Sequence, residues 1–122
     1  MGIEFDDNRP IYQQLMTRIC REIIRGERES GEKLPSVREY AVDVGVNANT
    51  IQRVYRELEQ EQIVESRRGQ GTFITTDKQR LVTLREAMKQ ELIQQFSAQM
   101  QEMGYSHDEM IHGIEQERKE KA

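Results

Sequence analysis

Residues 31–74 of the chain read GEKLPSVREYAVDVGVNANTIQRVYRELEQEQIVESRRGQGTFI. Two short helical patterns joined by a tight turn come first, and a small β-hairpin with Arg67 and Arg68 at its tip follows. This order predicts a winged helix-turn-helix, in which the second helix of the turn lies in the major groove of DNA. We therefore expect a sequence-specific DNA-binding protein.

The ends of both helices of the turn are marked in the sequence. Residues 36–39, Ser-Val-Arg-Glu, have the spacing of a capping box, and Gly45 is suited to end the first helix in a left-handed conformation. Asn47 is predicted to cap the second helix, which we expect to run to about Glu61. About three residues separate the two helices, and this favours a helix-turn-helix over a general pair of helices.

Further elements are expected on both sides of this stretch. A helix is predicted from Pro10 to near Gly26, since apolar residues recur every four positions. Short strands are expected at 63–65 and 72–74. Thr76 or Asp77 should cap a long helix whose apolar positions, spaced three or four apart, form one stripe. These positions are Leu81, Leu84, Met88, Leu92, Phe96, Met100 and Met103.

A second capping box, Ser-His-Asp-Glu at 106–109, predicts a shorter final helix that contains Ile114. The last eight residues, EQERKEKA, are predicted to be frayed and solvated. We expect a mostly α fold, with a winged helix-turn-helix domain at 1–76 (three helices plus a hairpin wing) and a two-helix dimerisation region at 77–122.

The composition limits the protein's class. The 122 residues are 35% hydrophobic and 33% charged, with a net charge of −4. This negative net charge argues mildly against DNA binding, which needs Lys and Arg for phosphate contacts. A protein with this net charge can nevertheless have a locally basic face. A single cysteine, Cys20, excludes an intrachain disulfide and a cysteine-based zinc cluster. Without a run of about 18 apolar residues or a signal pattern, we expect no membrane span and a cytoplasmic location.

The second helix of the turn carries side chains suited to DNA bases. Amides pair with adenine and guanidinium groups with guanine, so Asn47, Asn49, Gln52 and Arg53 are candidates. The alternative is that Asn47 only caps the helix and that Gln52 and Arg53 are ordinary solvated positions.

Basic residues outside this helix have the same two interpretations. Arg67 and Arg68, in a narrow glycine-rich turn, could approach a phosphate or the minor groove, or they could be a solvated turn. Arg38, near the start of the first turn helix, would contact the phosphate backbone.

No candidate for catalysis or metal binding stands out. His107 and His112 are five residues apart, which is not the spacing of two ligands on one helix face. Gly69 and Gly71 lack the third glycine of a dinucleotide-binding loop. We therefore predict no enzyme activity, no cofactor and no metal.

Four motifs resemble the DNA-binding module of the GntR family of bacterial transcription regulators. They are PIYQQL at 10–15, LPSVRE at 34–39, GVNANTIQRVYRELE at 45–59 and ESRRGQGTFI at 65–74, within about residues 5–76. The resemblance implies a winged helix-turn-helix, a homodimer and a set of residues near operator DNA. That set is Arg38, Asn47, Asn49, Thr50, Gln52, Arg68 and Gly69. Ala48 departs from the many relatives with Arg or Pro there, so the operator preference stays open.

The segment after the hairpin is too short for a large effector-binding domain and resembles the YtrA-like subgroup, whose C-terminal part is two helices. An apolar stripe left open on such helices favours self-association, although it could instead fold back on its own chain. The spacing of four favours crossing helices or a small bundle over a long coiled coil. The predicted dimerisation residues are Leu81, Leu84, Met88, Leu92, Phe96, Met100, Met103 and Ile114.

Together these features predict a homodimeric repressor that binds double-stranded DNA at a palindromic operator. Two alternatives stay open. One is a protein-interaction adaptor that docks a partner through the winged helix. The other is a ligand-gated sensor, with a pocket at the dimer interface for a small-molecule effector of unknown identity.

Overall fold

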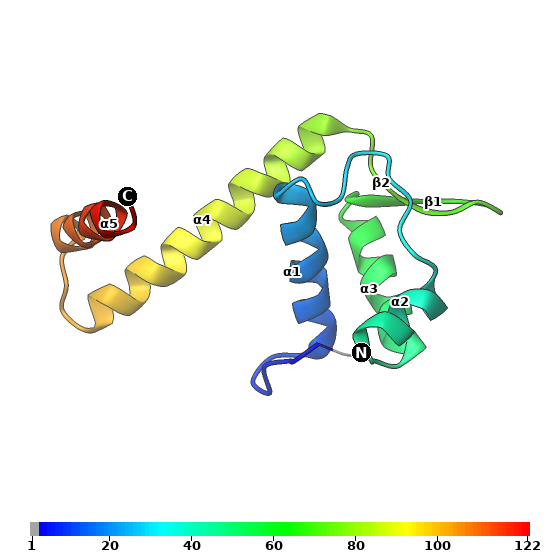
Figure 1. Ribbon diagram of the computed structural model, residues 1–122, viewed down its shortest axis with the longest axis horizontal. Coiled ribbons are helices and arrows are strands. Elements are labelled where there is room, and N and C mark those ends of the chain that lie inside the picture. Colours follow the sequence, from blue (N-terminus) through cyan, green and yellow to red (C-terminus); the bar gives the residue numbers. More distant parts are fainter. Residues whose placement is uncertain (1–2) are drawn as a thin grey trace. The chain divides into compact units, whose positions relative to one another are not determined.

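The structure, a computed structural model, describes residues 3–122. Its elements follow the order expected for a winged helix-turn-helix with two further helices (Figure 1). They are α1 (Ile11–Ile24), α2 (Val37–Val44), α3 (Ala48–Gln60), β1 (Val64–Arg67), β2 (Gly71–Ile74), α4 (Lys78–Glu102) and α5 (His107–Lys121). The chain forms two compact units that divide within α4, one ending at Leu84 and the other beginning at Arg85. The predicted domain boundary between residues 76 and 77 stays a prediction.

The core of the N-terminal unit lies where α1 and α2 pack against α3 (Figure 1). Leu15 and Ile19 from α1 and Ile51 and Leu58 from α3 are completely buried. These residues recur at helical spacing, so each helix buries one face and leaves the other to solvent. The buried face of α3 fixes the direction in which its polar face points.

The turn between α2 and α3 has the predicted caps. The backbone N–H of Glu39 donates to Ser36 Oγ (3.1 Å), and that of Ser36 donates to Glu39 Oε1 (3.0 Å). Gly45 closes α2 with a φ of 73°, a left-handed conformation that costs glycine little. Asn47 Oδ1 accepts a hydrogen bond from the backbone N–H of Asn49 (2.7 Å). The predicted helix-turn-helix is therefore confirmed.

The wing is an antiparallel hairpin with a third segment along one side. β1 and β2 pair from Val64–Ile74 to Arg67–Gly71. On the other side of β2, the backbone N–H of Leu34 donates to the carbonyl of Thr72 (2.8 Å). The prediction that Arg67 lies at the tip was wrong, because strand pairing continues to Arg67 and leaves only residues 68–70 in the turn.

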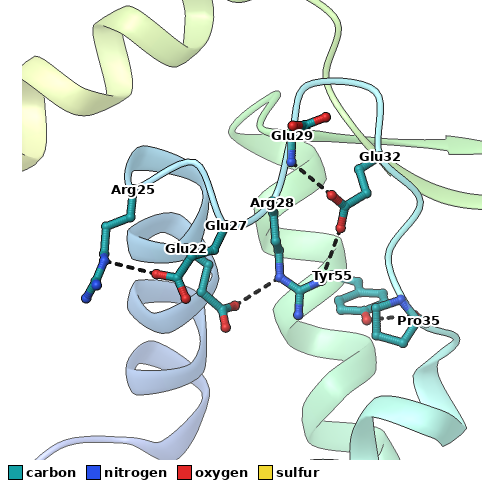
Figure 2. Close-up of polar contacts among 8 residues, drawn as sticks. All are labelled: Glu22, Arg25, Glu27, Arg28, Glu29, Glu32, Pro35 and Tyr55. Carbon is teal, nitrogen blue, oxygen red and sulfur yellow. Dashed lines mark hydrogen bonds and ion pairs between the residues drawn. The ribbon is translucent and has the colours of Figure 1, made fainter.

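Polar contacts join the connection between α1 and α2 to α1 and to α3 (Figure 2). Arg28 Nε donates to Glu22 Oε1 of α1 (2.9 Å). The hydroxyl of Tyr55, on α3, donates to the carbonyl of Pro35 (2.7 Å), just before α2 begins. These bonds fix the position at which the chain starts the helix-turn-helix.

The helices after the wing also begin at predicted caps. Asp77 Oδ1 accepts from the backbone N–H of Arg80 at the start of α4 (3.2 Å). The Ser106–Glu109 capping box starts α5. The prediction of a frayed end was wrong, since α5 continues to Lys121, which pairs with Glu117 one turn earlier (2.7 Å). Within residues 3–122, no helix is both long and apolar enough to span a membrane.

Candidate nucleic-acid interface

The N-terminal half of α3 presents a polar face to solvent. Asn49, Gln52 and Arg53 are exposed and, being three or four residues apart, share one side of the helix. Ile51 and Val54 are buried on the opposite side. The amide and guanidinium side chains that can pair with base edges are therefore all exposed on this side of α3.

Two residues at the start of α3 are partly engaged within the protein. Asn47 uses its side-chain oxygen as the helix cap, so its amide nitrogen is the atom left for another partner. Thr50 is half-buried. The capping role of Asn47 is thus shown, whereas its contact with DNA stays a prediction.

Arg53 is held by two neighbours. Its guanidinium carbon lies 3.6 Å from the centre of the Tyr12 ring, which belongs to α1. Its Nε donates to Glu57 Oε2, one turn further along α3 (3.0 Å). Tyr12 was not predicted as a site residue, because spacing within one helix gives no information on a contact with another helix. Its place in the PIYQQL motif was the only available signal.

A shallow surface hollow of about 310 Å³ lies beside this pair. It is lined by Ile11, Tyr12, Asn49, Thr50 and Arg53. One wall comes from the beginning of α1 and the other from the beginning of α3. Four of the lining side chains, those of Tyr12, Asn49, Thr50 and Arg53, can donate hydrogen bonds, and the last of them is a cation.

The two arginines of the wing differ in their surroundings. The Arg67 guanidinium stacks over the Phe73 ring and pairs with Glu65 at 3.0 Å. Arg68 and Gly69 lie exposed in the turn, and Gly69 has a φ of 75° with nothing near the position of a Cβ. The tip of the wing therefore presents Arg68 on a narrow turn.

Lys33, in the segment before α2, places a further basic group beside the hairpin. It is bridged to Phe73 on β2, and its side chain crosses over Gly71. A Cβ at Gly71 would lie 2.8 Å from Lys33 Cε. Glycine at this position leaves room for the lysine chain against the wing.

Arg38 lies exposed on α2, near its start. It lines a second hollow of about 410 Å³ with Pro35, Glu39, Val42 and Asp43. Since two carboxylates share this hollow, the charge there is mixed rather than basic. The predicted phosphate contact of Arg38 stays a prediction.

The predicted dimerisation residues have different exposures. Leu92, Phe96, Met103 and Ile114 are exposed. Leu81, Met88 and Met100 are half-buried, and Leu84 is buried in the N-terminal unit. Their role in dimerisation stays a prediction.

Known proteins resemble this chain in sequence. The family model for bacterial regulatory proteins of the gntR family matches residues 11–74. The HTH-type transcriptional regulator YhcF of Bacillus subtilis (strain 168) is 44% identical over 114 residues, which cover 93% of this chain and 94% of YhcF. The HTH-type transcriptional repressor YtrA of the same organism is 37% identical over 90 residues, 69% of each chain.

Solved structures agree with these sequence matches. A GntR family transcriptional regulator from Listeria monocytogenes is 39% identical with a TM-score of 0.87, covering 92% of this chain and 98% of that one. AraR(DBD) in complex with operator ORR3 is 29% identical with a TM-score of 0.53, covering 62% of this chain and 88% of that one. The chain therefore belongs to the GntR family of DNA-binding bacterial transcription regulators and, within it, to the YtrA-like subgroup.

Proposed function

We propose that the protein is a homodimeric repressor that binds a palindromic operator. The N-terminal half of α3 would lie in the major groove, and the wing would place Arg68 in the adjacent minor groove. The observation that carries this proposal is the outward face of Asn49 and Gln52 on a helix fixed by its buried side. The repressor named among the relatives and the operator complex of AraR(DBD) support it.

The C-terminal unit would supply the dimer contact. Leu92, Phe96 and Ile114 leave large apolar side chains exposed, and such surface favours association with another copy. In a dimer with two-fold symmetry, each α3 helix would face one half-site, and the two half-sites would lie about one turn of DNA, roughly 34 Å, apart. The bound dimer would repress transcription by blocking polymerase at the operator. It would act in the cytoplasm, where the chromosome is accessible.

A salt titration of DNA affinity tests the proposal. The DNA is a fragment that the wild-type protein enriches from a random-sequence pool. Arg68→Ala should weaken binding to all sequences and reduce the slope of log K against log salt by about 0.9, the value for one phosphate contact. Gln52→Ala should instead reduce the difference between enriched and random DNA.

Arg21→Ala, a change at an exposed arginine near the end of α1, is the matched control for loss of one positive charge. It should leave the sequence preference intact and the salt slope nearly unchanged. If the wild-type protein enriches no sequence, the proposed function fails. Co-purification of a protein partner without DNA would favour the adaptor, and a thermal shift with a metabolite would indicate a ligand-gated sensor.

A further inference from the structure

We infer that Tyr12 is a positioning residue for DNA binding: its ring holds the Arg53 guanidinium beside the hollow between α1 and α3, where Arg53 contacts a backbone phosphate. This inference rests on the proposed function, because it assigns one contact within the proposed complex. Tyr12 acts through Arg53 and needs no DNA contact of its own.

The geometry restrains the arginine in two ways. The Tyr12 ring lies 3.6 Å from the guanidinium carbon, within the range of a cation–π contact. Glu57 Oε2 accepts a hydrogen bond from Nε at 3.0 Å. A guanidinium has five N–H donors, so the terminal nitrogens keep their donors for another partner. The side chain is half exposed, and an outside ligand can reach it.

The surroundings of Arg53 match a phosphate better than a base. Asn49 and Thr50 line the same hollow, so an amide and a hydroxyl lie beside the cation. Arginine, threonine and asparagine side chains are common donors to phosphate oxygens. The hollow also borders α1, and Gln52, although exposed on the same side of α3, is not among the residues that line it. A contact here would fix the depth of α3 in the groove without reading sequence.

Holding the arginine in place reduces the cost of binding. A free arginine side chain loses rotamer freedom when it contacts a phosphate, and the ring and the carboxylate restrict this freedom beforehand. A cation–π contact at an exposed site corresponds to about a two- to five-fold change in an equilibrium constant. We expect a loss of this size in DNA affinity when the ring is removed.

A double-mutant cycle on the full chain tests the inference. DNA affinity is measured for wild type, Tyr12→Leu, Arg53→Ala and the double variant, on the fragment that the wild-type protein enriches. Tyr12→Leu should weaken binding about two- to five-fold in the presence of Arg53 and have no effect in its absence. Arg53→Ala should reduce the salt slope by about 0.9 and leave the sequence preference unchanged.

Two replacements separate positioning from a role in folding. Tyr12→Phe keeps the ring and should restore the affinity that Tyr12→Leu loses. Pentafluorophenylalanine at position 12 keeps the shape of a phenyl ring but removes the negative face that attracts a cation, so it should bind DNA as weakly as Tyr12→Leu. This second replacement tests the cation–π contact even if Tyr12→Leu lowers the melting temperature.

Each outcome decides one question. If Tyr12→Leu weakens binding equally with and without Arg53, or if the fluorinated ring binds as tightly as phenylalanine, the positioning role is wrong while the proposed function stands. If the wild-type protein enriches no DNA, the proposed function itself fails. Arg21→Ala again controls for the loss of one charge.

Discussion

The guanidinium of Arg67 lies 4.1 Å from the centre of the Phe73 ring, so the last residue of β1 is stacked on the opposite strand of the wing. Glu65 completes the contact with an ion pair at 3.0 Å. The two consecutive arginines of the hairpin are therefore unequal: Arg67 contributes to the structure of the wing, and Arg68 is presented at its tip.

Replacement of Arg67 should reduce stability more than replacement of Arg68. Arg67→Ala removes the stacking on Phe73 and is expected to lower the free energy of unfolding by about 0.5–1 kcal/mol, since the site is partly exposed. Arg68→Ala should change it by less than about 0.5 kcal/mol. Urea unfolding followed by circular dichroism measures both. Equal unfolding midpoints for the two variants would show that the stacking contributes nothing.

The capping box of α2 makes stability depend on pH. The backbone N–H of Ser36 donates to the Glu39 carboxylate, and this bond is the main reason that the pKa of Glu39 lies below its ordinary value of 4.5. Because the folded-state pKa is lowered, the contribution of the carboxylate is complete above pH 4.5 and is lost as the pH falls through the folded-state pKa.

The difference in unfolding midpoint between the wild-type protein and Glu39→Gln should therefore shrink as the pH falls below 4.5. Urea titrations at neutral and acidic pH measure it. Asn47→Ala is the matched control, because it removes the cap of α3, a hydrogen bond with no titrating group, and should cost about 1 kcal/mol at both pH values. A constant difference for Glu39→Gln would contradict the assignment.

Cys20 should react slowly with thiol reagents in the native protein. Burial is the main cause that raises the pKa of its thiol from 9.0 to about 11, and the side chain is only 6% exposed. Thiolate is the reactive form, so we expect slow labelling by Ellman's reagent at pH 8. Labelling in guanidinium chloride should be fast and is the control. Rapid, complete labelling of the native protein would show that the region around Cys20 opens readily.

A charge on the apolar face of α4 should disrupt the proposed dimer. Leu92 is 64% exposed, so Leu92→Asp should leave each chain folded while shifting its mass in light scattering from dimer to monomer. Loss of two-headed binding should lower operator affinity by about 100-fold or more.

Val42→Asp is the matched control for the light-scattering measurement. It places the same charge at an exposed apolar residue, because Val42 is 76% exposed, but on α2 in the other unit. That variant should keep the oligomeric state of the wild-type protein. A dimeric Leu92→Asp protein would show that the contact between the two copies lies elsewhere.

Local signals in the sequence predicted the helix ends well. The boxes at Ser36 and Ser106 and the cap at Asn47 each involve residues only two or three positions apart. Such contacts follow from short spacing and the chemistry of the side chains. The turn of the helix-turn-helix, and through it the fold, could therefore be predicted without knowledge of any distant contact.

Contacts between distant residues could not be predicted in this way. The Tyr12–Arg53 contact joins two helices. The stacking of Arg67 on Phe73 depends on how far the strands pair, and the predicted strands ended two residues before Arg67 and began one residue after Gly71. At the end of α5, the frayed-end prediction considered polarity alone and overlooked the Glu117–Lys121 pair. Polar helix ends can be stabilised by such pairs.

The segment that runs along β2 has a consequence for solubility. An unpaired strand edge is a template for pairing with another chain and a common start of aggregation. In this wing, Leu34 pairs with Thr72 on the outer edge of β2, and on β1 the backbone N–H of Ser66 donates to Glu59 of α3 (3.0 Å). Because the segment before α2 covers the edge of β2 and a side chain occupies one N–H of β1, two hairpins brought close together have fewer free backbone groups with which to form a continuous sheet.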